Sequence, residues 1–435
     1  MARAMKDSGI EWIGLMPSSW ELHRLKSCIA DRTSGAWGNE ATGGEGDMIC
    51  LRIADFDYDR FSFKSTPTEL LTKRNYDQTT IKTLQLQKGD ILIEKSGGGE
   101  KTPVGRTVIF DKEYPALYAN FMDRLRCSDF VLGKWLQYVF VTFYKNEFSR
   151  NYIKQTTGIQ NLDLTSLLSS ERIPIPSPEE QARIVNFLDN ECARIDAVIE
   201  QTRASIEEYK KLKQAVITHS VTKGIRTNRP MKDSGINWVG FMPEDWIIRK
   251  GKWILAKLER PVLGTDEVIT CFRDGEVTLR SNRRVEGFTI SFQETGYQGI
   301  EVGDLVVHGM DGFAGAIGVS DSRGKGTPVL NVLDSNQCKK YLMYYLRSMA
   351  YNGVFLALAT GIRVRSCDTN WNKLKELQYP VPPKAEQEEI VSYIDTQLDK
   401  INRLISEKQA FIAAIESYKK SLIYEYVTGK KEVSI

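Results

Sequence analysis

Apolar residues recur at alternating steps of three and four positions between Glu179 and Val221, and the same ladder returns 206 residues later. A three-four alternation is the heptad seam of a coiled coil, so two long helices are predicted to pair along it. The predicted seam residues are Val185, Leu188, Cys192, Ile195, Ile199, Ile206, Tyr209 and Val216 in the first segment and Val391, Ile394, Leu398, Ile401, Ile405, Ile412, Ile415 and Leu422 in the second.

Polar residues interrupt the two seams at equivalent positions. Thr202 and Lys213 stand in the first ladder, and Lys408 and Lys419 fill the same two gaps in the second. Polar residues inside a seam lower its stability but help to fix the register of pairing.

Prolines precede each predicted helix, and a glycine, Gly224 or Gly429, follows each one. Proline permits a helix start, and glycine can take the left-handed conformation that ends a helix. About 45 residues at 1.5 Å each give a rod of roughly 65 Å. Because the linker 223–230 is short, the second helix is expected to run back antiparallel to the first, with one globular block at each end of the rod.

A short motif stands before each globular block. Met5 to Trp20 returns as Met231 to Trp246, with 11 of the 16 positions identical. The order of motif, long block and helix therefore occurs twice and describes a pseudo-dimer within one chain. The motif tryptophans are expected to anchor each motif to the rest of its copy by packing, and stacking against a partner protein is the alternative. They are Trp12, Trp20, Trp238 and Trp246.

Inside the two blocks the pattern changes to short strands and turns. Residues 89–93 and 303–307 resemble each other as turn-then-strand units, and each leads into a glycine-rich loop. Helical stretches are expected at 132–147 and 339–351. The offset between copies falls from 226 to 206 along the chain, so the first block is 20 residues longer. The predicted fold is α/β: two globular domains separated by a long antiparallel two-helix coiled coil, with an internal pseudo-two-fold repeat.

These patterns give the following expected boundaries. The repeat motif, the first globular block and the central helix with its linker cover 1–20, 21–173 and 174–230. The second copies of these three segments cover 231–246, 247–379 and 380–435.

Composition narrows the possible functions. The 435 residues are 41% hydrophobic and carry a net charge of only +3, so any nucleic-acid surface must come from local clusters. Seven scattered cysteines, no CxxC pair and three histidines argue against a disulfide framework or a zinc site and favour a reducing cytoplasm. Asp7 and Glu11 argue against a signal peptide, and the most apolar region, 343–360, falls short of a membrane span.

Four motifs in duplicated order carry a resemblance to a known family. They are GIxWxGxMPxxW in both copies, TTGIQNLD at 156–163, IPIPSPEEQ at 173–181 and VPPKAEQ at 381–387. Over essentially its whole length the chain resembles the specificity subunit of type I restriction–modification systems.

The resemblance implies a division of labour. Two target-recognition domains would each read one half of a split double-stranded DNA sequence, and the helices would set the gap between the halves. The helices would also dock two DNA methyltransferase subunits, and restriction subunits with endonuclease and translocase activity would join that core. The cofactors S-adenosylmethionine, ATP and Mg would belong to those partners, which methylate adenine N6. The specificity subunit itself is expected to bind no cofactor and to perform no chemistry.

Candidate DNA contacts in the first block lie in the loop after residue 93 and near TTGIQNLD. Backbone amides that no side chain covers, and nearby cations, can reach phosphates or base edges from such loops. A plain flexible turn is an equally good interpretation of the first loop. That loop resembles a phosphate-binding loop but lacks the Gly-Lys-Ser/Thr ending. The candidates are Lys95, Ser96, Gly97, Lys101, Arg106, Thr156, Thr157, Gly158 and Gln160.

In the second block the candidates are cations and one amide. Arginine forks suit guanine and an asparagine amide suits adenine, while a solvated charged turn is the competing interpretation. The candidates are Arg280, Asn282, Arg283, Arg284, Arg363 and Arg365. The last two follow Thr360-Gly361-Ile362. The first copy has Gln160-Asn161-Leu162 at the corresponding positions, so the second block departs from the motif of the first there. His308 is expected to be structural.

Absent motifs argue against catalysis in this chain. It contains no Asn/Asp-Pro-Pro-Tyr/Phe methyltransferase tetrapeptide, no Walker lysine and no paired-carboxylate nuclease signature. The leading hypothesis is a DNA-reading subunit in a bacterial or archaeal cytoplasm. A coiled-coil scaffold that binds only proteins and a stand-alone nuclease remain as alternatives.

Overall fold

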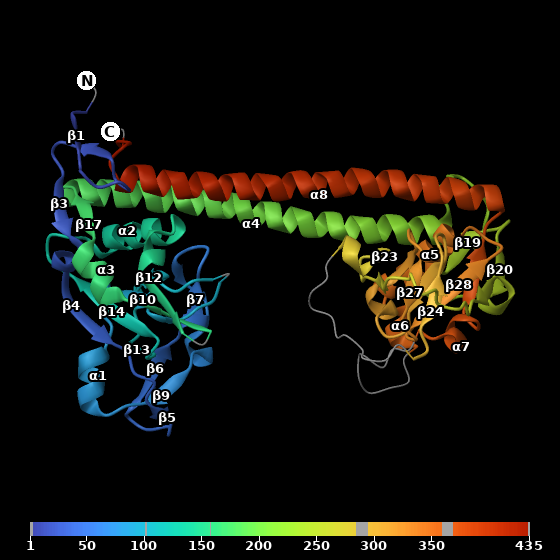
Figure 1. The fold of residues 1–435 in the computed structure, drawn as a ribbon, viewed down its shortest axis with the longest axis horizontal. Helices are drawn as coiled ribbons and strands as arrows, with labels where there is room; N and C mark the ends of the chain where they lie inside the picture. The colour runs from blue at the N-terminus through green and yellow to red at the C-terminus, as the bar shows by residue number, and fades with distance from the viewer. Residues whose placement is uncertain (1–2, 101, 157, 284–294, 359–368, 434–435) are drawn as a thin grey trace. The chain divides into compact units, whose positions relative to one another are not determined.

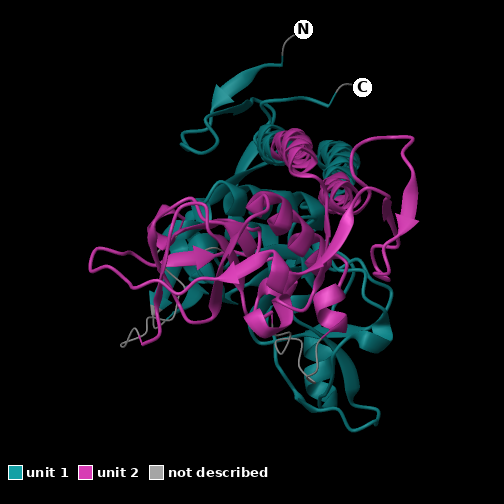
Figure 2. Cartoon of the chain, turned by 90° about the vertical axis from the view of Figure 1, so that its right-hand side faces the viewer, with its two compact units in different colours: residues 1–203, 409–435 teal, residues 204–408 magenta. Residues whose placement is uncertain are grey.

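The computed structural model describes residues 3–100, 102–156, 158–283, 295–358 and 369–433. The chain forms two compact units: unit 1 comprises residues 1–203 and 409–435, and unit 2 comprises residues 204–408 (Figure 2). Each unit contains one repeat motif, one globular block and half of each long helix. The segments 174–230 and 380–435, expected as separate helical regions, are therefore each divided between the two units.

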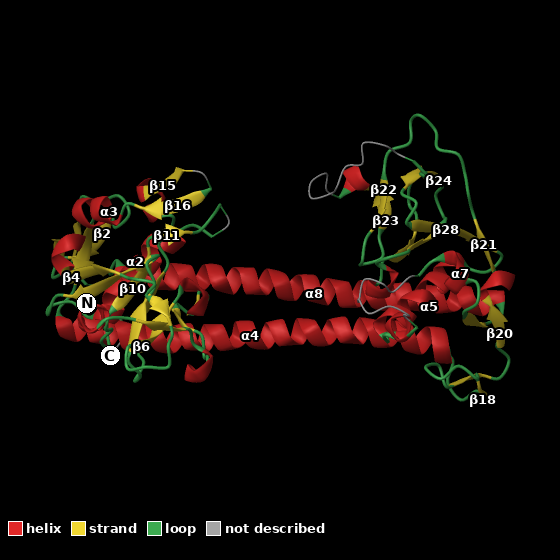
Figure 3. Ribbon diagram, turned by 90° about the horizontal axis from the view of Figure 1, so that it is seen from below, coloured by secondary structure: helices red, strands yellow, loops and turns green. Residues whose placement is uncertain are grey.

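Two long helices stand where the heptad pattern predicts them, and each runs without a break in Figures 1 and 3. α4 spans Pro178–Lys223 and α8 spans Lys384–Val427. The predicted seam is confirmed as a buried or half-buried stripe: Val185, Leu188, Cys192, Ile195, Ile199, Ile206, Ile394, Ile401 and Leu422 are buried, while Tyr209, Val216, Val391, Leu398, Ile405, Ile412 and Ile415 are half-buried.

Within each unit the two helices run antiparallel, as predicted. In unit 1 Lys419 contacts Asp196 and Glu416 contacts Arg203, so residue numbers rise along α4 as they fall along α8. Unit 2 shows the same opposition. There Lys213 donates to Asn402, and the ammonium of Lys408 lies 5.7 Å from the ring centre of Tyr209.

The repeat motif folds identically in both units. β1 (Met5–Asp7) pairs with β2 (Leu15–Pro17), and β18 (Met231–Asp233) pairs with β19 (Phe241–Pro243) in the same register. Trp20 and Trp246 are fully buried, with ring centres 5.6 Å from Trp135 and 6.5 Å from Tyr341 respectively. Trp12 packs on Phe143 and Trp238 on Tyr345, so the predicted packing role of the tryptophans is confirmed.

One pair of antiparallel strands closes each globular block. β3 (Glu21–Arg24) enters the first block and pairs with β17 (Arg172–Ile175), which leaves it. β20 (Ile247–Lys250) and β29 (Gln378–Val381) do the same in unit 2. A 3-10 turn follows each entering strand: η1 (Leu25–Cys28) in unit 1 and η5 (Gly251–Trp253) in unit 2. Each exit strand leads through prolines directly into a long helix.

The cores of the two blocks share one antiparallel sheet, although their sequences differ. Its strand order is β12-β10-β14-β4 in unit 1 and β26-β25-β28-β21 in unit 2. The strands are β4 (Ile29–Ser34), β10 (Ile91–Glu94), β12 (Thr107–Ile109) and β14 (Met122–Cys127), and β21 (Leu255–Lys257), β25 (Leu305–His308), β26 (Ile317–Val319) and β28 (Leu330–Ser335). A 13-residue helix follows in each unit: α2 (Gly133–Lys145) or α5 (Lys339–Tyr351).

The turn-then-strand units predicted at 89–93 and 303–307 are confirmed as the equivalent starts of β10 and β25. In each, an almost fully buried aspartate accepts a hydrogen bond from the amide three residues before it: Asp90 from Gln87, and Asp304 from Glu301. Arg126 pairs with Asp90 and Arg260 pairs with Asp304. The buried carboxylate is the same in both copies, but its charge partner differs: Arg126 lies on β14, whereas Arg260 lies in the segment after β21.

Additional elements distinguish unit 1. A second sheet has the order β13-β6-β9-β5, from β5 (Asn39–Glu40), β6 (Asp47–Leu51), β9 (Lys73–Asn75) and β13 (Ala116–Tyr118). A third has the order β11-β16-β15, from β11 (Ser96–Gly97), β15 (Ile153–Thr156) and β16 (Ile159–Leu162). Beside them lie β7 (Phe56–Asp57), β8 (Ser62–Phe63), α1 (Gln78–Leu84), α3 (Leu164–Ser170), η2 (Ile53–Asp55), η3 (Thr68–Leu70) and η4 (Phe148–Tyr152).

Unit 2 carries a different set. Its own strand pairs are β22 (Ile269–Cys271) with β23 (Val277–Leu279) and β24 (Gln298–Ile300) with β27 (Gly324–Gly326). Its short helices are α6 (Val354–Ala357), α7 (Trp371–Leu374), η6 (Arg280–Asn282) and η7 (Gly312–Ala314). The two blocks therefore differ, as expected, in the strands and short helices around the shared sheet.

The Glu-Gln pair at the start of each long helix joins that helix to its block. The carboxamide of Gln181 accepts the amide of Leu132, which is the N-cap of α2, and donates to Pro176 O. Gln387 makes the same two contacts, with Cys338 of α5 and Pro382. Because a helix start leaves several amides unpaired, each glutamine satisfies one of them from the neighbouring element. We call the shared sheet, the closing strands and this capping contact the repeated framework.

Candidate nucleic-acid interface

The structure brings together the two predicted DNA-binding stretches of unit 1. Ser96 and Gly97 form β11, which pairs with β16 so that Ser96 faces Asn161 and Gly97 faces Gln160. The hydroxyl of Ser96 donates to Asn161 Oδ1 at 2.7 Å. Gly97 has φ +122, a conformation that side chains rarely allow. The glycine-rich loop therefore begins with a short strand that is paired to β16.

Lys95 stands beside this edge but is already paired. Its ammonium donates to Asp123 Oδ1 at 2.6 Å and to Ser34 Oγ at 2.7 Å, and Arg32 donates to the other oxygen of Asp123 at 2.7 Å. Burial would raise the pKa of Asp123, but the hydrogen bonds from Lys95, Arg32 and Ser34 hold it below its ordinary value. Two cations share one carboxylate, so this cluster keeps one positive charge at the surface.

Arg106 has a different environment from the one predicted. Its guanidinium makes two hydrogen bonds to Glu94, at 2.6 and 2.7 Å, and lies 3.7 Å above the ring centre of Tyr58. Its side chain is 11% exposed and that of Glu94 1%. Burial holds the pKa of Glu94 above its ordinary value, against the lowering effect of Arg106. These surroundings favour a structural role for Arg106 over the predicted DNA contact.

The remaining candidates of unit 1 divide into three groups. Gln160 is buried, and its side chain accepts the amide of Val104. Gly158 is exposed, and Thr156 ends strand β15. Lys101 and Thr157 lie outside the described residues.

In unit 2 two of the three described candidates, Arg280 and Arg283, line one pocket. It has a volume of about 830 Å³, and Arg280, Arg283, Arg273 and His308 are among its lining residues. Arg283 pairs with Asp274 at 2.6 Å and with Glu276 at 3.1 Å. Such exposed ion pairs contribute little to stability.

The other candidates of unit 2 are held by neighbours or lie outside the described residues. Arg280 Nε lies 3.4 Å from Thr270 Oγ1, and Asn282 donates to Thr278 at 2.9 Å. His308 accepts the amides of Met310 and Asp311, and burial lowers its pKa, which agrees with the structural role expected for it. Arg284, Arg363 and Arg365 lie outside the described residues.

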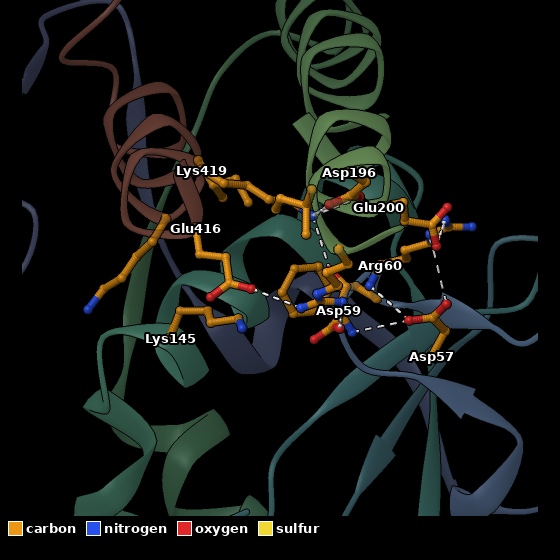
Figure 4. Close-up of a pocket in the computed structure, with 13 residues that line it drawn as sticks. Asp57, Asp59, Arg60, Lys145, Asp196, Glu200, Glu416 and Lys419 are labelled. Atoms are coloured by element: carbon orange, nitrogen blue, oxygen red, sulfur yellow. Dashed lines mark hydrogen bonds and ion pairs between the residues drawn. The ribbon is translucent and has the colours of Figure 1, made fainter. Parts of the chain in front are cut away.

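A charged cluster in unit 1 was missed at the sequence level. The loop after β7 reaches the paired helices, where Lys419 donates to both oxygens of Asp196 and to Asp59 O (Figure 4). Arg60 pairs with Glu200 at 2.6 Å, and Arg203 pairs with Asp59 at 3.2 Å. The lysine in the seam was visible in the sequence, but its partners come from a loop whose position only the fold determines.

Other site classes find no support in the described part of the chain. Within residues 3–100, 102–156, 158–283, 295–358 and 369–433, no three His, Cys, Asp or Glu side chains are grouped to hold a metal ion. Over the same ranges, the helices lack a stretch long and apolar enough to cross a membrane. The six cysteines with described surroundings are free thiols.

Comparison with known proteins favours the hypothesis of a DNA-reading subunit. A family model described as "Type I restriction modification DNA specificity domain" matches residues 64–208. The StySPI specificity subunit of Salmonella potsdam is 24% identical over 75% of this chain and 73% of its own length. A putative type I specificity subunit, MjaX of Methanocaldococcus jannaschii, is 22% identical over 97% of this chain and 96% of its own.

The chain carries a type I restriction–modification DNA specificity domain and is similar to the specificity subunits of these systems over almost its whole length.

Solved structures agree with this assignment at the level of the fold. One solved chain comes from a study of complex assembly and conformational transition of the type I R-M system. It aligns with 96% of this chain and 99% of its own length, with a TM-score of 0.68 and 13% sequence identity. The HsdS subunit from Thermoanaerobacter tengcongensis covers 96%, with a TM-score of 0.50, 13% identity and 98% of its own length matched. The resemblance seen in the four sequence motifs is confirmed.

Proposed function

We propose that this specificity subunit reads a bipartite double-stranded DNA site, with unit 1 and unit 2 each recognising one half. The proposal rests on one observation: the two units share the repeated framework, but the strands and loops around it differ between them. Equivalent frameworks suit the opposite strand directions of two half-sites, and unlike strands and loops around them suit unlike sequences. Two weak bindings joined in one chain also become one strong binding through effective concentration.

The paired helices α4 and α8 are proposed to set the gap between the half-sites. The DNA contacts proposed for the recognition domains are those predicted from the sequence, apart from Arg106 and the buried Gln160. In unit 1 the paired strands β11 and β16 supply the edge that would approach the DNA. In unit 2 the surroundings of Arg280, Asn282 and Arg283 would do so.

We further propose that the helices dock two methyltransferase subunits, joined by restriction subunits. Large apolar side chains stay exposed at equivalent positions of the two copies. Val198 and Leu404 are 39% and 38% exposed, and Leu212 and Tyr418 are 46% and 52% exposed. Because the exposed positions repeat in both copies, they suit contact with a protein partner that is itself present twice. Because each unit carries one member of each pair, two copies of one partner fit better than a single partner.

The chemistry is assigned to those partners. S-adenosylmethionine, with methyl transfer to adenine N6, and ATP with Mg would belong to the methyltransferase and restriction subunits. This chain would supply sequence recognition in a bacterial or archaeal cytoplasm.

The test is adenine methylation by the assembled complex. The chain is expressed with its methyltransferase partner in a host that lacks other adenine methyltransferases, and modified adenines are mapped across the genome. The expected result is one bipartite motif with a fixed gap. Sequence-independent methylation, or an unchanged pattern without this chain, would overturn the proposal and favour a scaffold.

The docking surface has its own test. Val198→Glu and Leu404→Glu should each lower the number of methyltransferase subunits bound from two to one, as measured by native mass spectrometry. Exposed Leu70→Glu, which lies in the first block and away from the helices, is the matched control. Full occupancy in both helix variants would rule out this surface.

A further inference from the structure

Unit 1 carries an open apolar hollow that the predicted contacts did not include. It has a volume of about 410 Å³. Its lining residues are Trp37, Arg52, Ile53, Ala54, Ala119, Asn120 and Phe121. Trp37 and Phe121 are 41% and 48% exposed, which is unusual for side chains of this size. An exposed apolar patch with polar neighbours marks a binding surface.

The two aromatic side chains sit on fixed backbone. The carbonyl of Trp37 accepts Arg74 Nε at 3.1 Å, and the next residue, Gly38, has φ +65 in a turn where any Cβ would lie 2.7 Å from the ring of Tyr76. The carbonyl of Phe121 accepts the amide of Lys95 at 3.0 Å. The backbone that carries the two rings is therefore held in place before any ligand arrives, which reduces the entropy lost on binding.

Cations stand at the rim of the hollow. Lys64 Nζ donates to Ala54 O at 2.7 Å, and the guanidinium of Arg74 lies 4.7 Å from the ring centre of Trp37. Over the described ranges, neither cation has an ion pair with a carboxylate. Arg52, at the edge of the same hollow, pairs with Asp55 at 3.1 Å. An apolar floor between unneutralised cations fits a ligand that is apolar at one edge and anionic at its flanks.

The location of the hollow favours DNA over a protein partner as its ligand. Its walls come from the segments around β6 and β13, which belong to the second sheet of unit 1, and the described part of unit 2 has no such sheet. A partner that docks equally on both units needs a surface present twice, so a surface present once fits the half-site that unit 1 alone reads. The hollow also adjoins the predicted DNA edge, because a Cβ on Gly97 would lie 3.9 Å from Ile53 Cδ1.

We propose that this hollow receives the 5-methyl edge of thymine in the half-site read by unit 1, with Lys64 and Arg74 on the flanking phosphates. The 5-methyl of thymine is the apolar group that unmodified base pairs present in the major groove. This inference rests on the proposed function. It adds Trp37 and Phe121 as residues that determine sequence specificity.

Replacing thymine by uracil removes only that methyl group and so tests the contact directly. The full chain, assembled with its methyltransferase partner, is titrated against fluorescent duplexes in which each thymine of the mapped site is replaced in turn. Wild type should bind about fourfold more weakly per contacted methyl, at one or two thymines within one half-site. With Phe121→Ala this uracil penalty should disappear, while penalties in the other half-site stay unchanged.

Two further variants sharpen the result. Leu70→Ala, which removes another exposed apolar side chain of unit 1, should keep every uracil penalty of wild type. Lys64→Ala should weaken binding to all sequences alike and lower the salt dependence by about one phosphate contact.

The outcomes separate this inference from the proposed function. A half-site without a uracil-sensitive thymine, or penalties that persist in Phe121→Ala, would overturn the inference while sequence-specific binding remained. Equal loss of thymine and uracil duplexes in Phe121→Ala would also overturn it, because it would show a ring inserted between bases. Loss of all sequence preference in wild type would instead refute the proposed function.

Discussion

The charge inside the helix seam allows a quantitative prediction. Lys419 of unit 1 and Lys213 of unit 2 occupy equivalent positions, 206 residues apart, and so do their partners Asp196 and Asn402. The same polar layer is therefore an ion pair in one unit and an ion with an amide in the other. Asp196→Asn and Asn402→Asp exchange the two chemistries with a change of one group each.

The environment of each polar layer determines how much the unfolding free energy should change. The side chains of Lys419 and Asp196 are 8% and 16% exposed, with Nζ 2.7 and 2.9 Å from the two oxygens. Removing one partner of a buried pair costs about 3–5 kcal/mol, but asparagine keeps one acceptor, so we expect Asp196→Asn to lose about 2 kcal/mol of unfolding free energy. Lys213 is half-buried, and its pKa is lowered mainly by burial and further by the positive charge of Arg347. Asn402→Asp should therefore gain about 0.5–1 kcal/mol.

The assay is urea unfolding of the full chain followed by circular dichroism at 222 nm. The midpoint of the transition that reports unit 1 should fall in Asp196→Asn, and that of unit 2 should rise in Asn402→Asp, at unchanged slopes. Lys419→Met combined with Asp196→Asn closes a double-mutant cycle and isolates the pair. A loss below about 0.3 kcal/mol in Asp196→Asn, or a destabilised Asn402→Asp, would refute the reasoning.

Three other outcomes are expected. Arg106→Ala should destabilise unit 1 by about 3 kcal/mol in urea unfolding, because it leaves Glu94 buried and unpaired, and it should leave the recognised sequence unchanged in methylation mapping. Asp123, whose pKa lies below its ordinary value, contributes stability that is present above that ordinary value and is lost as pH falls through the folded value. Acid titration of unfolding free energy should thus show a loss below about pH 4 that is shallower in Asp123→Asn. Inserting one helical turn, about 5.4 Å, into both α4 and α8 should change the gap between half-sites by one or two base pairs and leave the bases read unchanged.

Periodic features of this chain were predictable because they follow from local rules. The heptad seam predicted α4 and α8 nearly to the residue, and the repeated sequence predicted two equivalent copies within one chain. Both patterns depend on side-chain spacing along one element, which a sequence displays directly. The antiparallel direction followed from segment order and linker length.

The shared sheet was largely hidden, because β10 and β25 find their neighbours through contacts between strands far apart in the chain. The same limit applies to the candidate site. The sequence selected Arg106 for its charge, but the burial of Glu94, twelve residues earlier, decides its role. Trp37 and Phe121 gave no signal, since an isolated aromatic residue more often indicates a core position.

The hydrogen-bonded pairing of β3 with β17, and of β20 with β29, makes each globular block a closed loop with adjoining ends. Between Arg24 and Arg172 the chain advances 148 residues, and between the corresponding Lys250 and Gln378 it advances 128, yet both loops return to the same strand pair and helix start. The length and content of a block are thereby uncoupled from the helices it precedes. A block from a related chain that ended in the same two strands could replace either one, and the enclosing helices would keep their register.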